Sequence, residues 1–194
     1  MLLERVVEAE YAAVVALANL AYRGTGGQEG EASASWNVET GLIEGPRLTE
    51  ASLREELAEK PELLVWREVA GGPLMGTVWM QSKGEGVWYL GLLTVRPEVQ
   101  NRQMGRTLLA AAETYAKERG GRKITMTVLS GRDALMAWYE RRGYRKTGET
   151  QPYPYGDGRI GRPLRDDLHF VVMEKSFAES CADGEGLRVV VPMN

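Results

Sequence analysis

One stretch constrains the fold more than any other: an apolar run at residues 88–95 that leads directly into a helical pattern. The run, Trp-Tyr-Leu-Gly-Leu-Leu-Thr-Val, lies between Gly86 and Pro97, which is typical of a strand covered on both faces. Proline cannot donate a ladder hydrogen bond, so the strand is expected to end at Pro97. Apolar side chains then recur with the period of a helix at Met104, Leu108, Leu109, Ala112, Tyr115 and Ala116. The stretch therefore predicts a strand, a tight turn and the start of a helix.

The turn between this strand and this helix offers donors to an anion. The first N–H groups of a helix have no partner within it and carry roughly half a positive charge, which suits a phosphate. Gly105 allows a ligand to approach the backbone closely, and Arg102 and Arg106 add full charges. An ordinary strand–helix junction with solvated arginines has the same spacing. The residues alone leave both interpretations open.

The rest of the chain alternates helical and strand patterns. Helices are expected at 8–22, 49–59, 103–119 and 133–142, and strands at 2–7, 63–69, 74–81, 87–95, 123–129, 144–149 and 168–175. The three strands from 63 to 95 are joined by short turns, so they should form an antiparallel meander. The strand at 123–129 follows a helix, so a right-handed crossover should set it parallel to 88–95. The turn at 96–105 then lies at a carboxyl strand end, where open α/β sheets bind ligands.

Two segments carry a family resemblance. Residues 95–109, Val-Arg-Pro-Glu-Val-Gln-Asn-Arg-Gln-Met-Gly-Arg-Thr-Leu-Leu, resemble the acyl-CoA pyrophosphate loop of the GNAT N-acetyltransferase superfamily, Gln/Arg-x-x-Gly-x-Gly/Ala. Gln100 and Gly105 match its first and last members, and Gln103 stands where the middle glycine usually is. About 35 residues later, Tyr139-Glu-Arg-Arg-Gly-Tyr144 resembles the family segment Tyr-Glu-Lys-x-Gly-Phe. An Asn often precedes that helix in the family, and Arg132 takes its place here.

The resemblance implies a fold and a reaction. The fold is an α/β GNAT fold, a mixed central sheet of about seven strands with flanking helices and the acyl-CoA cleft between the fourth and fifth strands. Residues 1–175 would form the acetyltransferase domain and 176–194 a C-terminal extension. The implied function is an N-acetyltransferase that moves an acetyl group from acetyl-CoA, its cosubstrate, to an amine by direct attack in a ternary complex.

The resemblance also implies residue roles on the donor side. Acyl-CoA contacts are expected from Leu93, Thr94, Val95, Gln100, Asn101, Arg102, Gln103, Met104, Gly105, Arg106 and Thr107, and Arg132 could reach a CoA phosphate. A backbone N–H near 93–95 would polarise the carbonyl. Tyr139 would serve the leaving thiolate. A phenol near pKa ~10 is a weaker acid than a thiol near ~8.5, so a hydrogen bond is the safer role. For the general base, Glu39 and an ordered water both remain open.

On the acceptor side, the resemblance points to the segment between the first two helices and thus to Tyr22, Trp36 and Glu39. A second source is the long loop at 150–167, because a loop of that length in a compact domain is commonly functional. Tyr153 and Tyr155 of this loop either project into the acceptor cleft or pack the loop onto the body. The loop arginines at 159, 162 and 165 fit an anionic acceptor group and a solvated surface equally well.

Composition sets the outer limits. The chain has 194 residues, enough for one domain, and a net charge of −3, so no nucleic-acid or anionic membrane partner is expected. The single cysteine, Cys181, leaves no internal disulfide and fits a cytoplasmic location. Acids interrupt the first residues where a signal peptide would be apolar, and no run approaches the ~20 apolar residues of a membrane span. His169 is the only histidine, so no metal site is expected.

Two questions stay open at this point. The Gln103 and Arg132 departures motivate a rival function, a non-catalytic acyl-CoA-binding or interaction module on the same fold. The acceptor is expected to be a small-molecule or peptide amine, whose identity the sequence does not reveal. The tail at 176–194, with its apolar run Leu187-Arg-Val-Val-Val, is either an extra edge strand or a dimer arm, so a homodimer is one expectation.

Overall fold

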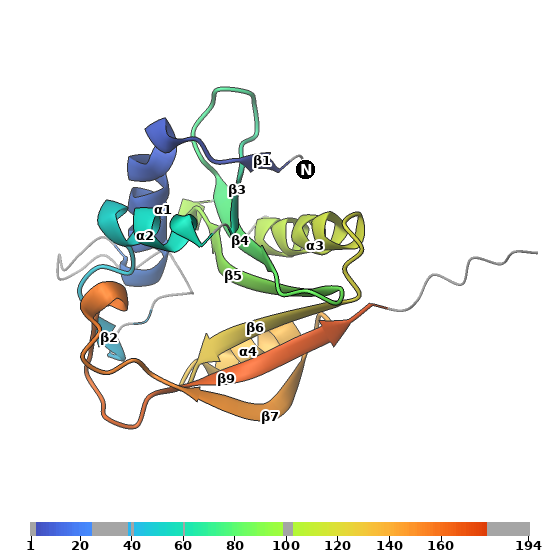
Figure 1. Cartoon of the computed structure of the whole chain (residues 1–194). Coiled ribbons are helices and arrows are strands. Elements are labelled where there is room, and N and C mark those ends of the chain that lie inside the picture. Colours follow the sequence, from blue (N-terminus) through green and yellow to red (C-terminus); the bar gives the residue numbers. More distant parts are fainter. Residues whose placement is uncertain (1–2, 25–38, 40, 60, 99–102, 178–194) are drawn as a thin grey trace, which may run out of the picture.

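The computed structural model describes residues 3–24, 39, 41–59, 61–98 and 103–177. Seven strands form one mixed sheet in the order β1-β3-β4-β5-β6-β9-β7 (Figure 1). They are β1 (Glu4–Arg5), β3 (Glu62–Trp66), β4 (Gly76–Ser82), β5 (Val87–Val95), β6 (Lys123–Leu129), β7 (Arg145–Pro152) and β9 (His169–Ser176). The helices are α1 (Tyr11–Arg23), α2 (Glu50–Ala58), α3 (Met104–Lys117) and α4 (Asp133–Glu140). The expected α/β class and mixed seven-stranded sheet are confirmed.

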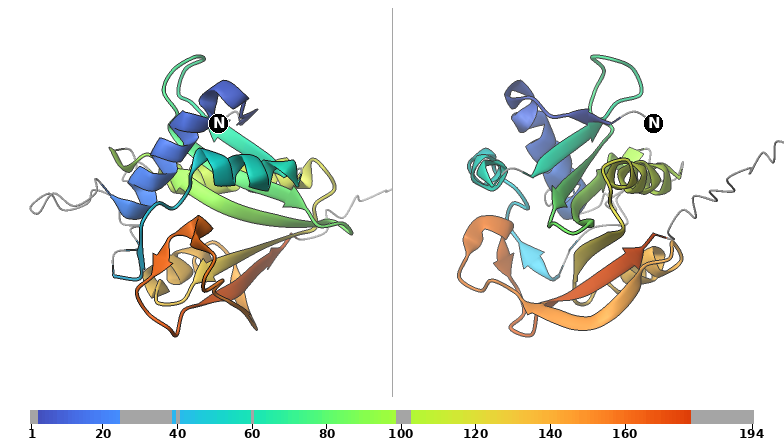
Figure 2. Two further views of the ribbon diagram at one scale, coloured as in Figure 1. Left: turned by 60° about the vertical axis from the view of Figure 1, so that its left-hand side comes forward. Right: turned by 45° about the vertical axis from the view of Figure 1, so that its right-hand side comes forward.

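Helices cover both faces of the sheet. Side chains alternate along β3 and β4, so that Leu64, Val78 and Met80 join one core cluster with α3 and α4. Leu63, Val65 and Trp79 join a second core cluster with α1 and α2. The alternation follows from the two-residue period of a strand, which sends successive side chains to opposite faces. Figure 2 shows the two layers of helices on either side of the central strands.

The central connectivity agrees with the sequence pattern. Strands β3, β4 and β5 pair antiparallel in sequence order, and β5 pairs parallel with β6 across the α3 crossover. In chain order, β5 and β6 are the fourth and fifth strands of the main sheet. The expected strand at 63–69 ends earlier, at Trp66, because a turn forms in which the Gly72 N–H donates to the Val69 carbonyl at 3.0 Å.

The long loop after β7 carries short elements of its own. It contains a 3₁₀ turn, η3 (Gly158–Ile160), and the strand β8 (Arg162–Pro163), while another 3₁₀ turn, η1 (Glu8–Glu10), precedes α1. Strand β8 pairs antiparallel with β2 (Ile43–Glu44) in a separate two-stranded sheet. In both Figures 1 and 2 the light-blue β2 lies against the orange loop, so two segments far apart in sequence meet there.

Candidate functional site

The site begins where β5 and β6 part. The two strands pair only at their first residues, from Val87↔Lys123 to Tyr89↔Thr125. Strand β5 continues to Val95, and β6 instead stays paired with β9 along its whole length. The two strands therefore diverge like the arms of a V, which Figure 1 shows opening toward α2 and β2. The backbone of both arms faces the opening.

A β-bulge lies on the β5 arm of the V. The register with β4 changes from Trp79↔Gly91 to Thr77↔Thr94, so Leu92 and Leu93 stand opposite the single residue Val78. Leu92 has a φ of 45°, in the left-handed region that favours glycine. A bulge leaves a residue without its ladder partner and bends the strand. The bulge thus directs backbone groups near Leu93 away from regular sheet pairing.

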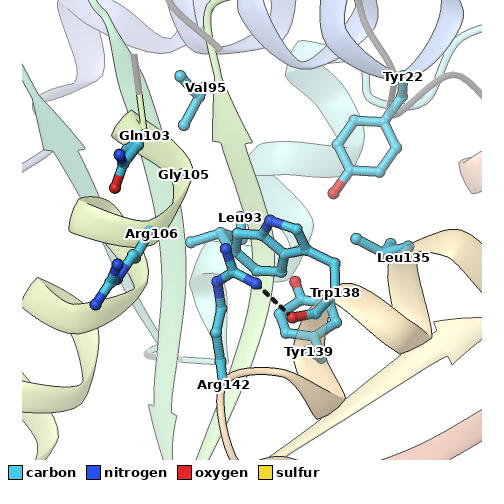
Figure 3. A pocket seen from close by; sticks show the side chains of 10 residues that line it. All are labelled: Tyr22, Leu93, Val95, Gln103, Gly105, Arg106, Leu135, Trp138, Tyr139 and Arg142. Carbon is cyan, nitrogen blue, oxygen red and sulfur yellow. Dashed lines mark hydrogen bonds between the residues drawn. The ribbon is translucent and has the colours of Figure 1, made fainter. Parts of the chain in front are cut away.

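A first cavity lies between α3 and α4, and we call it the α3–α4 cavity. It contains about 780 Å³ of empty space, including the part open to solvent. Ten residues line it: Tyr22, Leu93, Val95, Gln103, Gly105, Arg106, Leu135, Trp138, Tyr139 and Arg142. Figure 3 shows α3 contributing one wall, α4 and the residues after it a second, and Tyr22 closing the far side. The end of β5 forms the base.

The α3 wall includes the N-terminus of the helix. Gln103 is the N-cap residue with φ 59° and ψ 13°, no side chain in the described part of the chain caps the helix, and its first turn holds no acidic residue. Gly105 follows as the second helical residue and lines the cavity. The N-terminal N–H groups and the partial positive charge of α3 therefore face the cavity, an arrangement that suits a phosphate.

Arginines reinforce this positive end. Arg142 stacks its guanidinium 3.6 Å from the Trp138 ring centroid and donates to the Trp138 carbonyl at 2.6 Å. Its Nε is buried without a hydrogen-bond partner among the described residues. Burial, and then the like charges of Arg141 and Arg106, lower the Arg142 pKa. Positive groups this close together are stabilised by an anion. Arg142 lies within the segment 139–144 that carries the family resemblance. Residue spacing does not predict that its side chain faces this cavity.

Replacing Gln103 by glycine should stabilise the protein by about 0.5–1 kcal/mol. A non-glycine residue in the left-handed region costs about 1–2 kcal/mol, and the greater freedom of glycine in the unfolded chain offsets part of that gain. Urea unfolding of the wild type and the variant measures the difference. The matched control is Glu85→Gly, because Glu85 also has a positive φ, of 52°, but lies in the β4–β5 turn. A loss of stability in Gln103→Gly alone would show that the Gln103 side chain, and not its backbone, stabilises the turn.

Tyr139 is the central side chain of the α3–α4 cavity. Its ring makes edge contacts with Trp138 and Tyr144, at centroid distances of 5.0 and 5.6 Å. Burial raises the pKa of Tyr139 well above its ordinary value, and Tyr22 adds to the shift. No hydrogen bond from another described residue engages its hydroxyl. Tyr139 is therefore a protonated donor held in a fixed orientation beside the cavity.

A second cavity fills the V, and we call it the β5–β6 cavity. It contains about 1040 Å³ of empty space, again including its open part. Four residues, Tyr22, Leu93, Leu135 and Tyr139, line both cavities, so the two share a wall. Charged side chains on its wall are Glu39, Arg47, Glu56 and Arg132. The hydroxyl-bearing Tyr139 and the bulged strand thus stand where the two cavities meet.

A roof covers the β5–β6 cavity. The segment 41–47 and the loop 153–168 are joined by β2–β8 pairing and by a hydrogen bond from the Leu164 N–H to the Leu42 carbonyl at 2.9 Å. Arg23, at the end of α1, fastens both: its Nε donates to the Gly45 carbonyl at 2.6 Å and its Nη2 to the Ile160 carbonyl at 3.0 Å. One arginine therefore fixes two distant segments over the cavity.

Arg23 also takes part in a buried ion triad. Its Nη1 pairs with Glu39 Oε2, and Arg132 Nη1 donates to Glu39 Oε1 at 3.1 Å. The Glu39 side chain is only 6% exposed, and those of Arg23 and Arg132 are 13% and 9% exposed. Because both oxygens of Glu39 accept from guanidinium groups, Glu39 orients the two arginines.

A comparison with models of protein families identifies the family of this chain. A family model described as the acetyltransferase (GNAT) family matches residues 32–144, more than half of the chain. The chain belongs to the GNAT acetyltransferase family. The V, the bulge and the α3 N-terminus therefore belong to a member of this family, and acetyl-CoA is the acyl donor that this family uses.

Individual members of the GNAT family share only low sequence identity with this chain. The chain is 28% identical over 138 residues to mycothiol acetyltransferase of Cellulomonas flavigena, covering 61% of this chain and 38% of that protein. This chain therefore spans well under half the length of that curated relative. Solved structures share the fold. The ribosomal-protein-alanine N-acetyltransferase of Brucella melitensis has a TM-score of 0.60 at 19% identity, covering 91% of this chain and all of that chain.

Two further structures bear on the fold. The ribosomal-protein-S18-alanine N-acetyltransferase of Escherichia coli has a TM-score of 0.62 at 15% identity, with 93% and 97% of the chains covered. A GNAT acetyltransferase of Elizabethkingia anophelis, solved with acetyl-CoA bound, has a TM-score of 0.51 at 15% identity, with 64% and 82% covered. At these identities the likeness concerns the fold.

The GNAT donor residues expected from the sequence separate into groups. Leu93, Val95, Gln103, Gly105 and Arg106 come together on the α3–α4 cavity. Thr94 is buried with its hydroxyl donating to the Leu92 carbonyl, Met104 packs against the core, and the Thr107 hydroxyl donates to the Gln103 carbonyl. Gln100, Asn101 and Arg102 lie outside the described residues. Arg132 lies on the β5–β6 cavity, where it pairs with Glu39 instead of joining the α3 turn.

The acceptor residues expected from the sequence also divide. Tyr22 and Glu39 line the β5–β6 cavity, and Trp36 lies outside the described residues. Neither loop tyrosine lines it: Tyr153 is buried with its hydroxyl donating to the Gly161 carbonyl, and the Tyr155 hydroxyl accepts from the Leu168 N–H. Both therefore pack the loop onto the body. The arginines at 159, 162 and 165 pair with Asp157, Glu44 and Asp167.

Two absences hold for the part of the chain that the structure describes. No three His, Cys, Asp or Glu side chains there are grouped so that they could hold a metal ion. No helix in those ranges has the length and apolar character that crossing a membrane requires. Sequence reasoning missed Arg47 and Glu56, which stand in no motif, and Arg142, to which the motif at 139–144 assigns no role.

Proposed function

We propose that this chain is an acetyl-CoA-dependent N-acetyltransferase in which an amine attacks the thioester directly within a ternary complex. The observation that carries the proposal is the wall shared by the two cavities. A donor in the α3–α4 cavity and an acceptor in the β5–β6 cavity would meet beside Leu93 and Tyr139. Such a junction needs no covalent acyl-enzyme, because both reactants are held at contact distance together.

Residues on the donor side fit acetyl-CoA. The α3 N-terminus and Gly105 would receive the pyrophosphate, with Arg106 and Arg142 adding charge beside it. Residues 93–95, after the bulge, would lie along the acyl arm. A backbone N–H at the bulge would donate to the thioester oxygen as negative charge develops on it. The cosubstrate supplies an activated acetyl carbonyl.

In the proposed reaction, a protein side chain assists the leaving sulfur and water accepts the proton of the amine. The amine nitrogen bonds to the carbonyl carbon, the carbon–sulfur bond breaks, and sulfur leaves with the electron pair. Tyr139 would donate a hydrogen bond to that sulfur; its raised pKa opposes full transfer of its proton. Because the arginines hold both Glu39 oxygens, water that reaches the β5–β6 cavity would take the amine proton.

The extent of the domain and its partners are further parts of the proposal. Residues 1–175 would form the acetyltransferase domain and 176–194 an extension. The described part ends at residue 177, where the Phe177 N–H donates to the Arg122 carbonyl at 2.8 Å and so continues the β9 edge. The acceptor would be a small-molecule or peptide amine. A cytoplasmic location and a homodimer remain expectations from the sequence.

Replacing Gly105 by glutamate should weaken acetyl-CoA binding at least about tenfold. A carboxylate at the second residue of α3 would oppose the pyrophosphate in the field of the helix N-terminus. Gly105→Ala is the matched control: its Cβ would lie 3.5 Å from Trp138 Cζ2, an ordinary contact, so the fold should accept it. Calorimetric titration with acetyl-CoA measures both variants. Equal affinity in Gly105→Glu and the wild type would remove the pyrophosphate from this turn.

Turnover separates the enzyme from the rival function, a non-catalytic acyl-CoA-binding module. The wild type is assayed for CoA release with acetyl-CoA and a panel of polyamines, aminoglycosides, arylamines, amino acids and peptides. Release above the rate without an amine, with acetylated product, supports the transferase. Binding of acetyl-CoA without turnover on any amine would favour the binding module.

A further inference from the structure

Two charged side chains on the β5–β6 cavity have no ion-pair partner among the described residues. Glu39 and Arg132 pair with each other and with Arg23. Arg47 and Glu56 line the same cavity, both are partly buried, and no described residue forms an ion pair with either. Partly buried charges are costly unless something compensates them. Two side chains of opposite charge that line one cavity are suited to a ligand that carries both a positive and a negative group.

Arg47 lies close to the reacting end of the cavity. Its guanidinium carbon is 5.3 Å from the Tyr22 ring centroid, and that of Arg132 is 5.6 Å from the same centroid. Tyr22 belongs to the wall that the two cavities share. Arg47 and Arg132 line the cavity together with Glu39 and Glu56, and Arg23, which is not part of the lining, pairs with Glu39. These three arginines and two glutamates together have one positive charge in excess, contributed by Arg23 behind the wall, and this excess favours an anionic group on the acceptor.

Glu56 supplies the negative member of the pair. It stands on α2, the helix that follows Arg47 in the chain, and burial raises the pKa of its carboxyl. The charges of Arg47 and Arg159 oppose that shift, and those of Glu59 and Asp157 add to it. Arg159 already forms an ion pair with Asp157. An ammonium group of a ligand would stabilise the ionised carboxylate of Glu56 without displacing an existing pair.

Apolar side chains form part of the remaining wall of this cavity, beside the polar side chains of Tyr89, Thr127 and Gln151. Its walls include Ile43, Leu92, Met126, Val128, Leu129 and Phe170. Polar groups at one end and apolar groups along the walls are the usual composition of a site for a small molecule. The charged pair orients such a molecule, and the apolar wall accommodates its side chain.

We propose that the acceptor is a compact zwitterion of the amino-acid type, with an amino group and a carboxylate on neighbouring atoms and an apolar side chain. Arg47 binds the carboxylate, Glu56 attracts the amino group, and the apolar wall packs the side chain. This inference rests on the proposed acetyl transfer and deepens it by naming the acceptor class. A peptide N-terminus lacks the neighbouring carboxylate, and a polyamine has no carboxylate for Arg47.

The decisive comparison uses pairs of acceptors that differ only in this carboxylate. Initial rates are measured with L-leucine, L-methionine and L-phenylalanine and with the amide of each. The wild type should acetylate each acid with a kcat/KM at least about tenfold above that of its amide, because the amide leaves Arg47 without a counter-charge. This comparison needs no variant, so it does not depend on how any substitution folds. Amides that react as well as the acids would overturn the inference.

Variants then assign the two charges. Arg47→Gln should lower kcat/KM for the acids at least about tenfold and leave the amides within about threefold, so that the preference disappears. Glu56→Gln should lower both series together, since both carry the amino group. Arg54→Gln and Glu55→Gln, exposed on the same helix α2, are the matched controls and should change neither series. An acid preference that survives Arg47→Gln would contradict the assignment.

Failure of the inference can be told apart from failure of the proposed function. Spermidine and an alanine-initiated peptide are assayed beside the amino acids. Acetylation of either of these, with no acetylation of amino acids, would overturn the acceptor class and leave the transferase intact. No acetylation of any amine, with acetyl-CoA bound, would contradict both.

Discussion

Replacing Tyr139 by phenylalanine should lower kcat for acetyl transfer by about 100- to 1,000-fold and leave acetyl-CoA affinity nearly unchanged. Removal of one preorganised donor at a developing negative charge commonly has an effect of that size. The phenylalanine ring can keep the edge contacts with Trp138 and Tyr144, so the cavity should retain its shape. Steady-state rates and calorimetric titration of the same preparations separate the two effects.

The control for this variant is Tyr11→Phe, because Tyr11 stands on α1 outside both cavities. It should leave kcat unchanged. A Tyr139→Phe enzyme with wild-type kcat would remove Tyr139 from the chemistry. A large loss of acetyl-CoA affinity would instead make its role one of cosubstrate binding.

The pH profile tests the same assignment independently. Burial raises the pKa of Tyr139, so its hydroxyl stays protonated while the pH rises through the range in which an acceptor amine becomes neutral. The wild-type rate should therefore rise with pH and show no decrease from loss of the Tyr139 proton below about pH 10. A decrease near neutral pH that Tyr139→Phe abolishes would contradict the predicted protonation state.

Replacing Glu39 by glutamine should destabilise the protein by about 3–5 kcal/mol, which corresponds to a fall in Tm of about 10 °C for a chain of this size. Glutamine preserves the shape of the side chain but removes the charge between two nearly buried guanidinium groups. The uncompensated charges of Arg23 and Arg132 then repel each other. Because Arg23 also fastens the roof through Gly45 and Ile160, KM for the acceptor should rise as well.

A matched control separates this triad from an ordinary ion pair. Glu44 belongs to the same segment and pairs with Arg162, but these side chains are 59% and 73% exposed. Glu44→Gln should therefore cost only about 0–1 kcal/mol. Thermal unfolding of both variants gives the comparison. Similar small losses in the two would mean that water already screens the Glu39 triad.

Much of the scaffold could be predicted because its signals are local. The apolar run at 88–95, the helical period after it and the crossover to 123–129 rest on residues close in sequence, and the structure confirms the parallel pairing of these strands. The bulge could not be predicted. Leucine rarely adopts a positive φ, so nothing in the residue types marks Leu92 as the point where the register changes.

The acceptor side was harder to predict for a different reason. Glu39 lies 16 residues from Arg23 and 93 from Arg132, and only the packed fold brings the three together. The sequence left two interpretations of Tyr153 and Tyr155, and the hydrogen bonds of the loop decide for packing. Charged residues such as Arg47 and Glu56 look like solvated surface until a cavity is seen beside them.

The roof and the sheet come from separate parts of the chain, and this separation bears on how such a protein can diversify. The walls of the α3–α4 cavity come mainly from residues 93–98, 103–106 and 135–142, and the roof of the β5–β6 cavity from 41–47 and 153–168. Substitutions in the roof segments leave the bulged strand and the α3 turn untouched. Acceptor preference can therefore change, in evolution or in a library of variants, while the residues that bind acetyl-CoA stay the same. The condition is that Arg23 keeps the two roof segments joined.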